Sequence, residues 1–350
     1  MSEFPDFCCP QCKGLLYFHA KEYSCPQCTK RYPIVLGFPD FRVFHNQYTD
    51  YEPDDYKKAE FLLEQSDKLN FKELVRLYYS INPRVSKDRA ERFMGRMFAL
   101  VEKEVESLKE IEEVSKKRYR NRIGSDAVLE IGCGAGEFLI AAKDKFKHVI
   151  GIDITLRWLV VARKRLDELG LKALLICACA EYLPFEDGSF DLVIAEDVLE
   201  HVRCQEATLG ECRRVMNRGG ILFIATPNRF SIAPEPHVRV WGVGFLPRKW
   251  MNGYVKLFKG VSYEREYYKV LSFFELRMLL RKCSFQDHEI LLPRIPEAEL
   301  KGFSTFEKIQ VAVYNMVGKI PFIRALLYVI GPFFHIVCYA NKGRDGEDEL

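Results

Sequence analysis

Residues 128–153 constrain the fold of this chain more than any other stretch. They read VLEIGCGAGEFLIAAKDKFKHVIGID: an apolar run, the turn Gly132-Cys-Gly134-Ala-Gly136, an apolar stripe at helical spacing, and a second apolar run that ends on Asp153. This order of strand, glycine turn, helix, strand and acid is typical of a nucleotide-binding βαβ unit. Glycines let a backbone approach a ligand closely, and the helix that follows offers free N–H groups and the positive end of its dipole.

Glu137 argues against a dinucleotide in this turn. A dinucleotide fingerprint needs G-x-G-x-x-G, but here the third glycine comes one residue early and Glu137 stands in its place. A carboxylate in the first helical turn would repel a pyrophosphate, which disfavours a dehydrogenase. S-adenosylmethionine has no phosphate and carries two cationic groups, and Glu130 adds negative charge suited to such a ligand. Asp153, 17 residues after Gly136, suits the two hydroxyls of a ribose.

At these residues the sequence resembles the class I S-adenosylmethionine-dependent methyltransferases, whose first motif is a strand, a Glu or Asp, and then G-x-G-x-G. The resemblance covers residues 123–342 and implies an α/β, Rossmann-like fold with a seven-stranded sheet. It also implies which residues contact the cofactor in this first unit: Glu130, Gly132, Gly134, Gly136, Asp153 and Ile154.

Two later motifs carry the same resemblance. Ala180-Glu-Tyr-Leu-Pro-Phe resembles the stretch that binds adenine in the family, although the acid that precedes it there is Cys179 here. The resemblance then implies that the backbone at Ala180 and the side chain of Glu181 bind adenine. The stretch from Glu196 to Val202 matches the family's V-L-E-H motif, which ends a strand, opens a helix and lines the methionine end of the cofactor. This implies a cofactor contact at Glu196 and makes His201 a candidate base.

Residues 227–262 are too long for a bare connection, so we expect them to shape the substrate site. Basic and aromatic side chains interleave here, which suits an anionic acceptor such as a phosphate-bearing lipid, an acidic sugar or nucleic acid. The alternative is a solvated, partly buried loop. Pro234-Glu-Pro-His237 holds His237 on a rigid turn. His237 is our preferred general base, because that rim faces the methyl group in the family that the sequence resembles.

Residues 1–45 contain two C-x2-C knuckles, which predict a structural zinc site with four thiolate ligands: Cys9, Cys12, Cys25 and Cys28. The alternative is a set of free thiols. The following Tyr32-Pro, Gly37 and Pro39 resemble the end of the Trm112-like zinc ribbons. Such ribbons support methyltransferases in trans, and some bacterial ribosomal RNA methyltransferases carry a zinc module in cis. The resemblance implies a substrate-side or structural accessory.

The rest of the chain divides by pattern. Residues 46–122 have the apolar stripe of amphipathic helices and form a connector, with a lid over the cofactor site as the alternative. Residues 300–332 are helical and apolar and would divide a final antiparallel strand pair. No uncharged run there reaches the roughly 18–20 residues of a membrane span, so 300–340 would make peripheral membrane contact at most. The polar tail 343–350 is expected to be disordered.

Composition narrows the class of protein. The formal net charge of +3 is too small to indicate a nucleic-acid partner by itself. The N-terminal residues lack the pattern of a signal peptide, so the 12 cysteines favour metal ligation and free thiols in a reducing cytoplasm.

The sequence therefore predicts methyl transfer to an O or N nucleophile of a small-molecule, lipid or saccharide acceptor. An RNA methyltransferase and a non-catalytic zinc-ribbon scaffold are the alternatives, and the oligomeric state is left open.

Overall fold

The computed structural model describes residues 7–44, 54–82, 87–119, 123–260, 263, 269–293 and 305–340. The polar tail expected at 343–350 and several parts of the connector, among them 45–53 and 83–86, lie outside the described residues.

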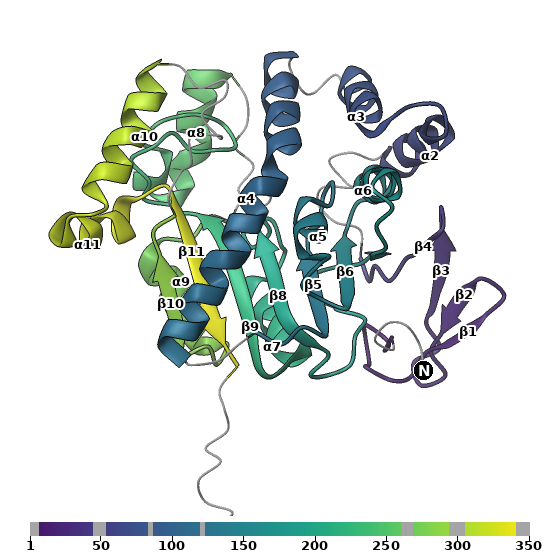
Figure 1. Cartoon of the computed structure of the whole chain (residues 1–350). Helices are drawn as coiled ribbons and strands as arrows, with labels where there is room; N and C mark the ends of the chain where they lie inside the picture. The colour runs from purple at the N-terminus through teal and green to yellow at the C-terminus, as the bar shows by residue number, and fades with distance from the viewer. Residues whose placement is uncertain are drawn as a thin grey trace, which may run out of the picture.

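A seven-stranded sheet forms the centre of the molecule (Figure 1), in the order β10-β11-β9-β8-β5-β6-β7. β5, β6, β7, β8 and β9 run parallel, whereas β11 is antiparallel to both of its neighbours. The predicted α/β class, the mostly parallel sheet and the final antiparallel pair are confirmed. The strands are β5 Ala127–Ile131, β6 His148–Asp153, β7 Leu174–Cys177, β8 Phe190–Glu196, β9 Met216–Pro227, β10 His288–Leu291 and β11 Phe333–Tyr339.

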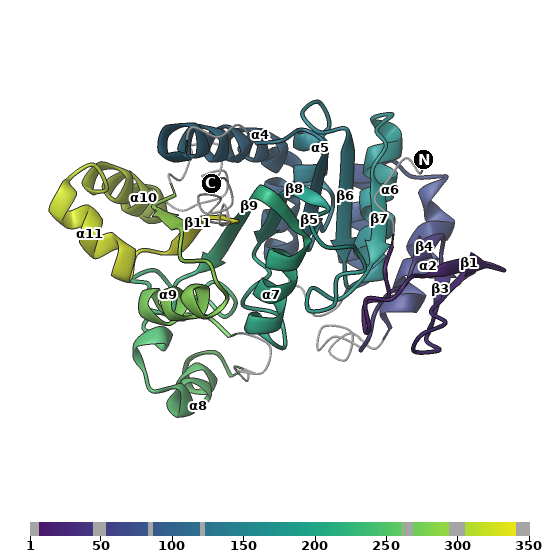
Figure 2. The same ribbon diagram turned by 90° about the horizontal axis from the view of Figure 1, so that it is seen from below.

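Helices cover both faces of the sheet (Figure 2). One apolar core joins the sheet to α4 (Lys87–Tyr119), α5 (Glu137–Ala142) and α6 (Leu156–Glu168). A second core joins the opposite face to α7 (Gln205–Val215) and α9 (Phe273–Lys282). β5 is buried at every position and four of its five residues are apolar, as is typical of a parallel strand covered on both sides.

The connector is helical where it is described, as predicted. α2 (Asp55–Ser66) and α3 (Phe71–Ser80) pack on α6, and α4 packs on α5. A capping box between Asn70 and Glu73 begins α3, and the expected apolar stripe is its buried face. Asp55 joins α2 to the start of α6: its carboxylate accepts from Leu156 N at 3.0 Å and from Arg157 Nη1 at 2.5 Å.

The N-terminal unit is a small antiparallel sheet beside the edge strand β7. Its strands are β1 Tyr17–His19, β2 Glu22–Ser24, β3 Arg31–Val35 and β4 Phe38–Pro39. Directly after β4 the chain runs parallel to β7, with a bridge between Asp40 and Cys177 and a hydrogen bond of 2.7 Å from Phe41 N to Cys177 O. This pairing covers the edge of the large sheet at that point.

One expectation from the sequence is wrong in detail. The V-L-E-H stretch does not open a helix; turns follow β8, and α7 begins only at Gln205. The turns are held by side chains, since Gln205 Nε2 donates to Leu199 O and Thr226 Oγ1 donates to the buried Glu200.

Within residues 227–260 the structure does not follow the alternative of a solvated loop. These residues contain η1 (Val243–Phe245) and the amphipathic α8 (Arg248–Lys259), which buries Met251 and Val255 one helical turn apart. The helical spacing of these buried residues is hard to recognise in the sequence, because aromatic residues are interleaved with them.

Two apolar helices lie between β10 and β11, as the sequence indicates: α10 (Thr305–Val317) and α11 (Pro321–Ile330). Among the described residues, the helices are all too short or too polar to cross a bilayer.

The Asp55–Arg157 ion pair gives a stability prediction, because both side chains are only 5% exposed. Asp55→Ala removes the carboxylate that faces a buried guanidinium and should lower the free energy of unfolding by about 3–5 kcal/mol. Urea denaturation followed by circular dichroism measures this. The matched control is Glu22→Ala, which breaks the exposed Arg31–Glu22 pair and should cost less than about 1 kcal/mol. Equal losses in the two variants would contradict the prediction.

Candidate functional site

The turn after β5 has the backbone that its glycines permit. Gly132, Gly134 and Gly136 have φ angles of 73°, 47° and 78°. A Cβ atom at Gly132 would collide with the side chain of Val198. The first residues of the turn are fixed to the neighbouring strand, because Gly132 N and Cys133 N both donate to Ile152 O, at 2.8 and 2.9 Å. Gly136 caps α5 in the left-handed conformation.

Asp153 ends β6 opposite this turn and binds it. Its Oδ2 accepts from Gly134 N at 3.1 Å, and its Oδ1 accepts from Thr155 N and Thr155 Oγ1 at 2.8 and 2.7 Å. Burial raises the pKa of Asp153, while the hydrogen bonds from Thr155 and Gly134 lower it. The carboxylate is therefore oriented by the fold before any ligand arrives.

A cavity of about 260 Å³ opens at the carboxyl ends of these strands, where open α/β sheets bind ligands. The structure brings seven of the predicted site residues together around it: Gly132, Gly134, Asp153, Ile154, Ala180, Glu181 and His201. The other described residues that line it are Phe44, Ile131, Ile152, Thr155, Arg157, Trp158, Ala178, Asp197, Val198 and Val202.

Three residues that the sequence assigned to the cofactor lie outside the lining. Gly136 acts at the start of α5. Glu196 pairs with Lys103 of α4, with 3.3 Å between Oε2 and Nζ. Glu130 lies in β5 behind the turn and is 8% exposed. Within the cavity Glu181 also has a structural task, because its Oε1 accepts from Arg203 N at 2.7 Å.

Glu130 belongs to a buried acidic group. Its Oε2 has no hydrogen-bond partner among the described residues. Burial raises the pKa of Glu130 well above its usual value, and the neighbouring carboxylates of Glu104, Glu137 and Glu196 raise it further. Glu137 is compensated by Arg165 at 2.8 Å. The wall behind the glycine turn therefore carries a carboxyl group whose negative charge is disfavoured in the empty site and would be favoured by a bound cation.

His201 lines the cavity, and His237, which lies outside its lining, contacts His201. The rings of His201 and His237 lie 5.1 Å apart and nearly perpendicular. His237 Nδ1 is 2.6 Å from Glu235 Oε1, and the other oxygen of Glu235 accepts from the backbone N–H groups of His237 and Val238, both at 2.8 Å. The carboxylate is thus held by the turn and fixes the imidazole. The predicted base candidates are brought together, although they are 36 residues apart in the chain.

Glu200 lies beneath this pair and is 1% exposed. Burial raises its pKa well above the usual range. One ligand atom each of Glu200, His201 and His237 lie within 4.8 Å of one another, a spacing short enough for a shared divalent cation.

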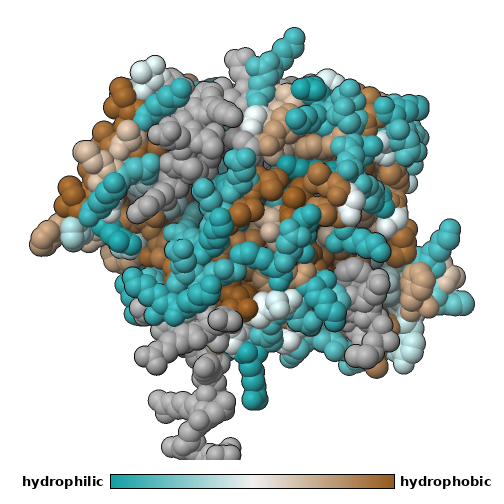
Figure 3. Space-filling model, viewed as in Figure 1, coloured by the Kyte–Doolittle hydropathy of each residue, from teal (hydrophilic) through white to brown (hydrophobic). Residues whose placement is uncertain are grey.

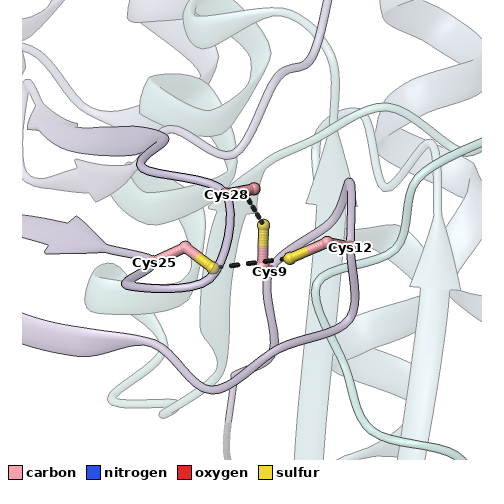
Figure 4. Close-up of side chains that lie close together, drawn as sticks. All are labelled: Cys9, Cys12, Cys25 and Cys28. Carbon is pink, nitrogen blue, oxygen red and sulfur yellow. Dashed lines mark hydrogen bonds between the residues drawn. The ribbon is translucent and has the colours of Figure 1, made fainter.

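The four predicted zinc ligands converge in the N-terminal unit (Figure 4). Cys9 and Cys28 Sγ are 3.5 Å apart, Cys12 and Cys25 Sγ are 3.4 Å apart, and all four sulfurs lie within 4.8 Å of one another. A tetrahedral zinc with Zn–S bonds of about 2.3 Å requires sulfurs about 3.8 Å apart. The donor set and spacing fit zinc.

Among the lining residues that sequence reasoning did not name individually are Phe44, Trp158 and Asp197, the last within the stretch 196–202 that was expected to line the cofactor. Asp197 follows the carboxyl end of β8 and has a φ of 51°, so its position after a strand was a usable signal. Trp158 lies on α6, packed against Tyr78. Phe44 comes from the N-terminal unit, and nothing local to it indicates the cavity.

Comparison with known proteins agrees with this geometry. Residues 129–224 match the model of a methyltransferase domain. The chain is 32% identical over 122 residues to a protein of Mycolicibacterium smegmatis named as a probable S-adenosylmethionine-dependent methyltransferase, a match to 35% of this chain and 46% of that one. It is 29% identical over 182 residues to the ubiquinone biosynthesis O-methyltransferase of Idiomarina loihiensis, covering 52% of this chain and 69% of that one.

The fold is similar to that of Haemonchus contortus phosphoethanolamine N-methyltransferase 2, solved with S-adenosyl-L-methionine. The identity is 16% and the TM-score 0.42, over 65% of this chain and 51% of that chain. At this distance the likeness does not bear on function. The chain spans about half the length of most of the curated relatives it matches. Residues 129–224 are therefore similar to a methyltransferase domain, and they lie within a Rossmann-like fold with a mostly parallel sheet.

The raised pKa of Glu130 predicts how stability depends on pH. A raised pKa means that the folded state binds the proton more tightly, so stability is lost as pH rises from the unfolded pKa, about 4.3, towards the folded one. Glu130→Gln removes this loss. The difference in the free energy of unfolding between Glu130→Gln and the wild type should therefore grow by about 1.4 kcal/mol for each pH unit in this interval.

Urea denaturation between pH 5 and pH 8 measures this difference. Glu102→Gln, at an exposed position of α4, is the control and should show no such trend. A constant difference between Glu130→Gln and wild type across the range would contradict the prediction.

Proposed function

We propose that this chain moves a methyl group from S-adenosylmethionine to an oxygen or nitrogen nucleophile of a small molecule. The observation that carries the proposal is the cavity in which Asp153 is bound to the glycine turn and His201 stands at the rim, within a methyltransferase domain. The activity of the whole chain is part of this proposal.

The residues present suit the cofactor. Asp153 offers an oriented carboxylate for the two ribose hydroxyls. Asp197 and the buried Glu130 provide carboxyl groups at the end of the cavity near the glycine turn, and an ammonium and a sulfonium lying there would favour their ionisation. The sulfonium supplies an activated methyl group, so the protein's tasks are to align the acceptor and to take up its proton where one is released.

His237 is the residue we assign to proton removal. Glu235 Oε1 lies 2.6 Å from Nδ1 of His237. In the tautomer whose Nδ1–H donates to this oxygen, Nε2 carries no hydrogen and can take a proton from the acceptor. The carboxylate also stabilises the imidazolium that forms. His201, edge-on to His237, orients that ring from the cavity side.

A small-molecule acceptor is favoured by two observations. Several of the relatives are named ubiquinone biosynthesis O-methyltransferases, and the net charge of +3 is close to neutral. An apolar portion of the acceptor is suggested by the exposed side chains of α10 and α11, among them Met316, Phe322 and Leu326, which form a hydrophobic surface on one side of the molecule (Figure 3). Lipids are thus included among the candidates, as are saccharides, and peripheral membrane contact would follow from a lipid acceptor.

RNA is the second candidate acceptor. It is supported by the N-terminal ribbon in cis and by the basic side chains of α8. Incubating cell extract with labelled donor and separating RNA, lipid and small molecules distinguishes these acceptors. A non-catalytic scaffold predicts no label in any fraction.

We also propose that residues 1–45 form a structural zinc ribbon of the Trm112-like kind, joined by the connector 46–122 to the catalytic unit 123–342. The four convergent thiols support the zinc. The unit is too small to bury a sizeable core of its own, so metal binding would contribute much of its stability.

Two variants separate binding from turnover. Asp153→Asn keeps the shape but removes the charge, and should weaken S-adenosylhomocysteine binding at least tenfold in calorimetry. His237→Asn should bind it as the wild type does and lose about 10²- to 10⁴-fold in the rate of label transfer. Asp126→Asn and His19→Asn, both exposed and distant in the fold, are the matched controls. A folded wild type that does not bind the ligand refutes the proposal.

The ribbon predicts stoichiometric zinc. Purified protein should contain about one zinc per chain by elemental analysis, and Cys12→Ser should retain much less, because three thiolates hold the metal less tightly than four. Cys204→Ser changes an exposed cysteine outside the cluster and should leave the zinc content intact. Zinc-free wild type with full stability would contradict the assignment.

A further inference from the structure

Phe44 brings the N-terminal unit into the cavity. It lies three residues after Phe41, on the segment that leaves the ribbon along β7, and it lines the cavity together with Ile154 and Ala178. The ribbon is therefore more than a neighbour of the catalytic unit, since the chain that leaves it supplies part of the cavity wall.

The segment from Asp40 to Phe44 is fixed at several points. Arg42 forms an ion pair of 2.6 Å with Asp40 and donates to Ile154 O, the residue after Asp153, at 3.2 Å. Both side chains of this pair are less than 15% exposed. The segment is thereby attached to the loop that carries the proposed ribose ligand.

Cys179 holds the other end of the segment. Its Sγ donates to Phe44 O at 3.5 Å. Burial raises the pKa of Cys179 to about 11, so the thiol keeps the proton that it donates. This cysteine stands where the resembled family has an acid that binds adenine, and here the position serves to hold Phe44 instead.

The ring of Phe44 is also oriented. The guanidinium of Arg203 lies over it, 4.2 Å from the centroid, and Tyr182 contacts it edge-on at 5.8 Å. A ring fixed in this way presents one apolar face at low entropic cost, which suits stacking against a planar base.

The order of the strands makes the two ends of the cavity chemically different. β5 and β8 end on the side of the glycine turn and Asp197, β6 ends at Asp153, and β7 ends on the side of Phe44. A nucleoside whose ribose lies at Asp153 therefore has an acidic end towards β5 and β8 and an apolar, aromatic end towards β7. A charged amino-acid group fits the first end and a purine fits the second.

We propose that Phe44 packs against the purine of the bound nucleoside, so that the segment leaving the ribbon completes the cofactor site that the catalytic unit begins. The inference rests on the proposed function. It replaces the missing adenine-binding acid by an aromatic contact from outside the catalytic unit.

Calorimetry on the full chain with two probes tests the proposal. S-adenosylhomocysteine reports the whole site, and adenosine reports the purine and ribose alone. Phe44→Ala should raise the dissociation constants of both probes about tenfold, because base–aromatic stacking commonly contributes that much. Phe44→Trp should restore binding. Phe44→Leu keeps the apolar bulk and should lie between Phe44→Ala and wild type, and it serves if Phe44→Ala does not fold.

The control is Phe18→Ala, which removes an exposed ring of the same ribbon, 60% accessible and remote from the cavity lining. Unchanged binding of both probes by a folded Phe44 variant overturns the inference while leaving the proposed function intact. Weaker binding of S-adenosylhomocysteine with unchanged adenosine binding would assign Phe44 to the amino-acid end and also overturns it. Failure of the wild type to bind either probe refutes the proposed function itself.

Discussion

The hydrogen bond from Gly134 N to Asp153 Oδ2 is the constraint around which the candidate site is built. It joins the turn after β5 to the end of β6, two strands that are neighbours in the sheet and consecutive in the chain. Because the turn lacks side chains at its tight positions, the backbone can come close enough to Asp153 for this bond to form. The carboxylate, the open turn and the cavity between them therefore arise from one local arrangement.

The same arrangement places carboxyl groups in the interior of the protein. Glu130 and Asp153 are both buried, and burial raises the pKa of each. Replacing such groups with neutral ones would make the empty protein more stable, but it would also remove carboxyl groups that can ionise when a cationic ligand binds. The site thus combines a rigid backbone with electrostatic energy that a ligand of the right charge can relieve.

Local sequence signals predicted most of the fold and about half of the cavity wall. Strand and helix patterns alternate from Ala127 onward, and this alternation predicts the parallel sheet. The glycine turn and Asp153 could be recognised because their roles depend on neighbours within one βαβ unit. Phe44 and Trp158 could not be found in this way. Their positions depend on packing between segments far apart in the chain, for which a single sequence carries no periodic signal. The start of α7 was misplaced because Glu200 and Gln205 stabilise a turn through their side chains.

The placement of β11 has a consequence for synthesis on the ribosome. This strand, at residues 333–339, lies between β9 and β10, so the emerging polypeptide makes both neighbours well before the strand that separates them. Until β11 arrives, β9 lacks its partner on that side and β10 has no place in the sheet. Unpaired strand edges of this kind attract other chains. The last strand therefore completes the sheet. A translation product that ends before β11 would expose the unpaired edge of β9 to chaperones and proteases.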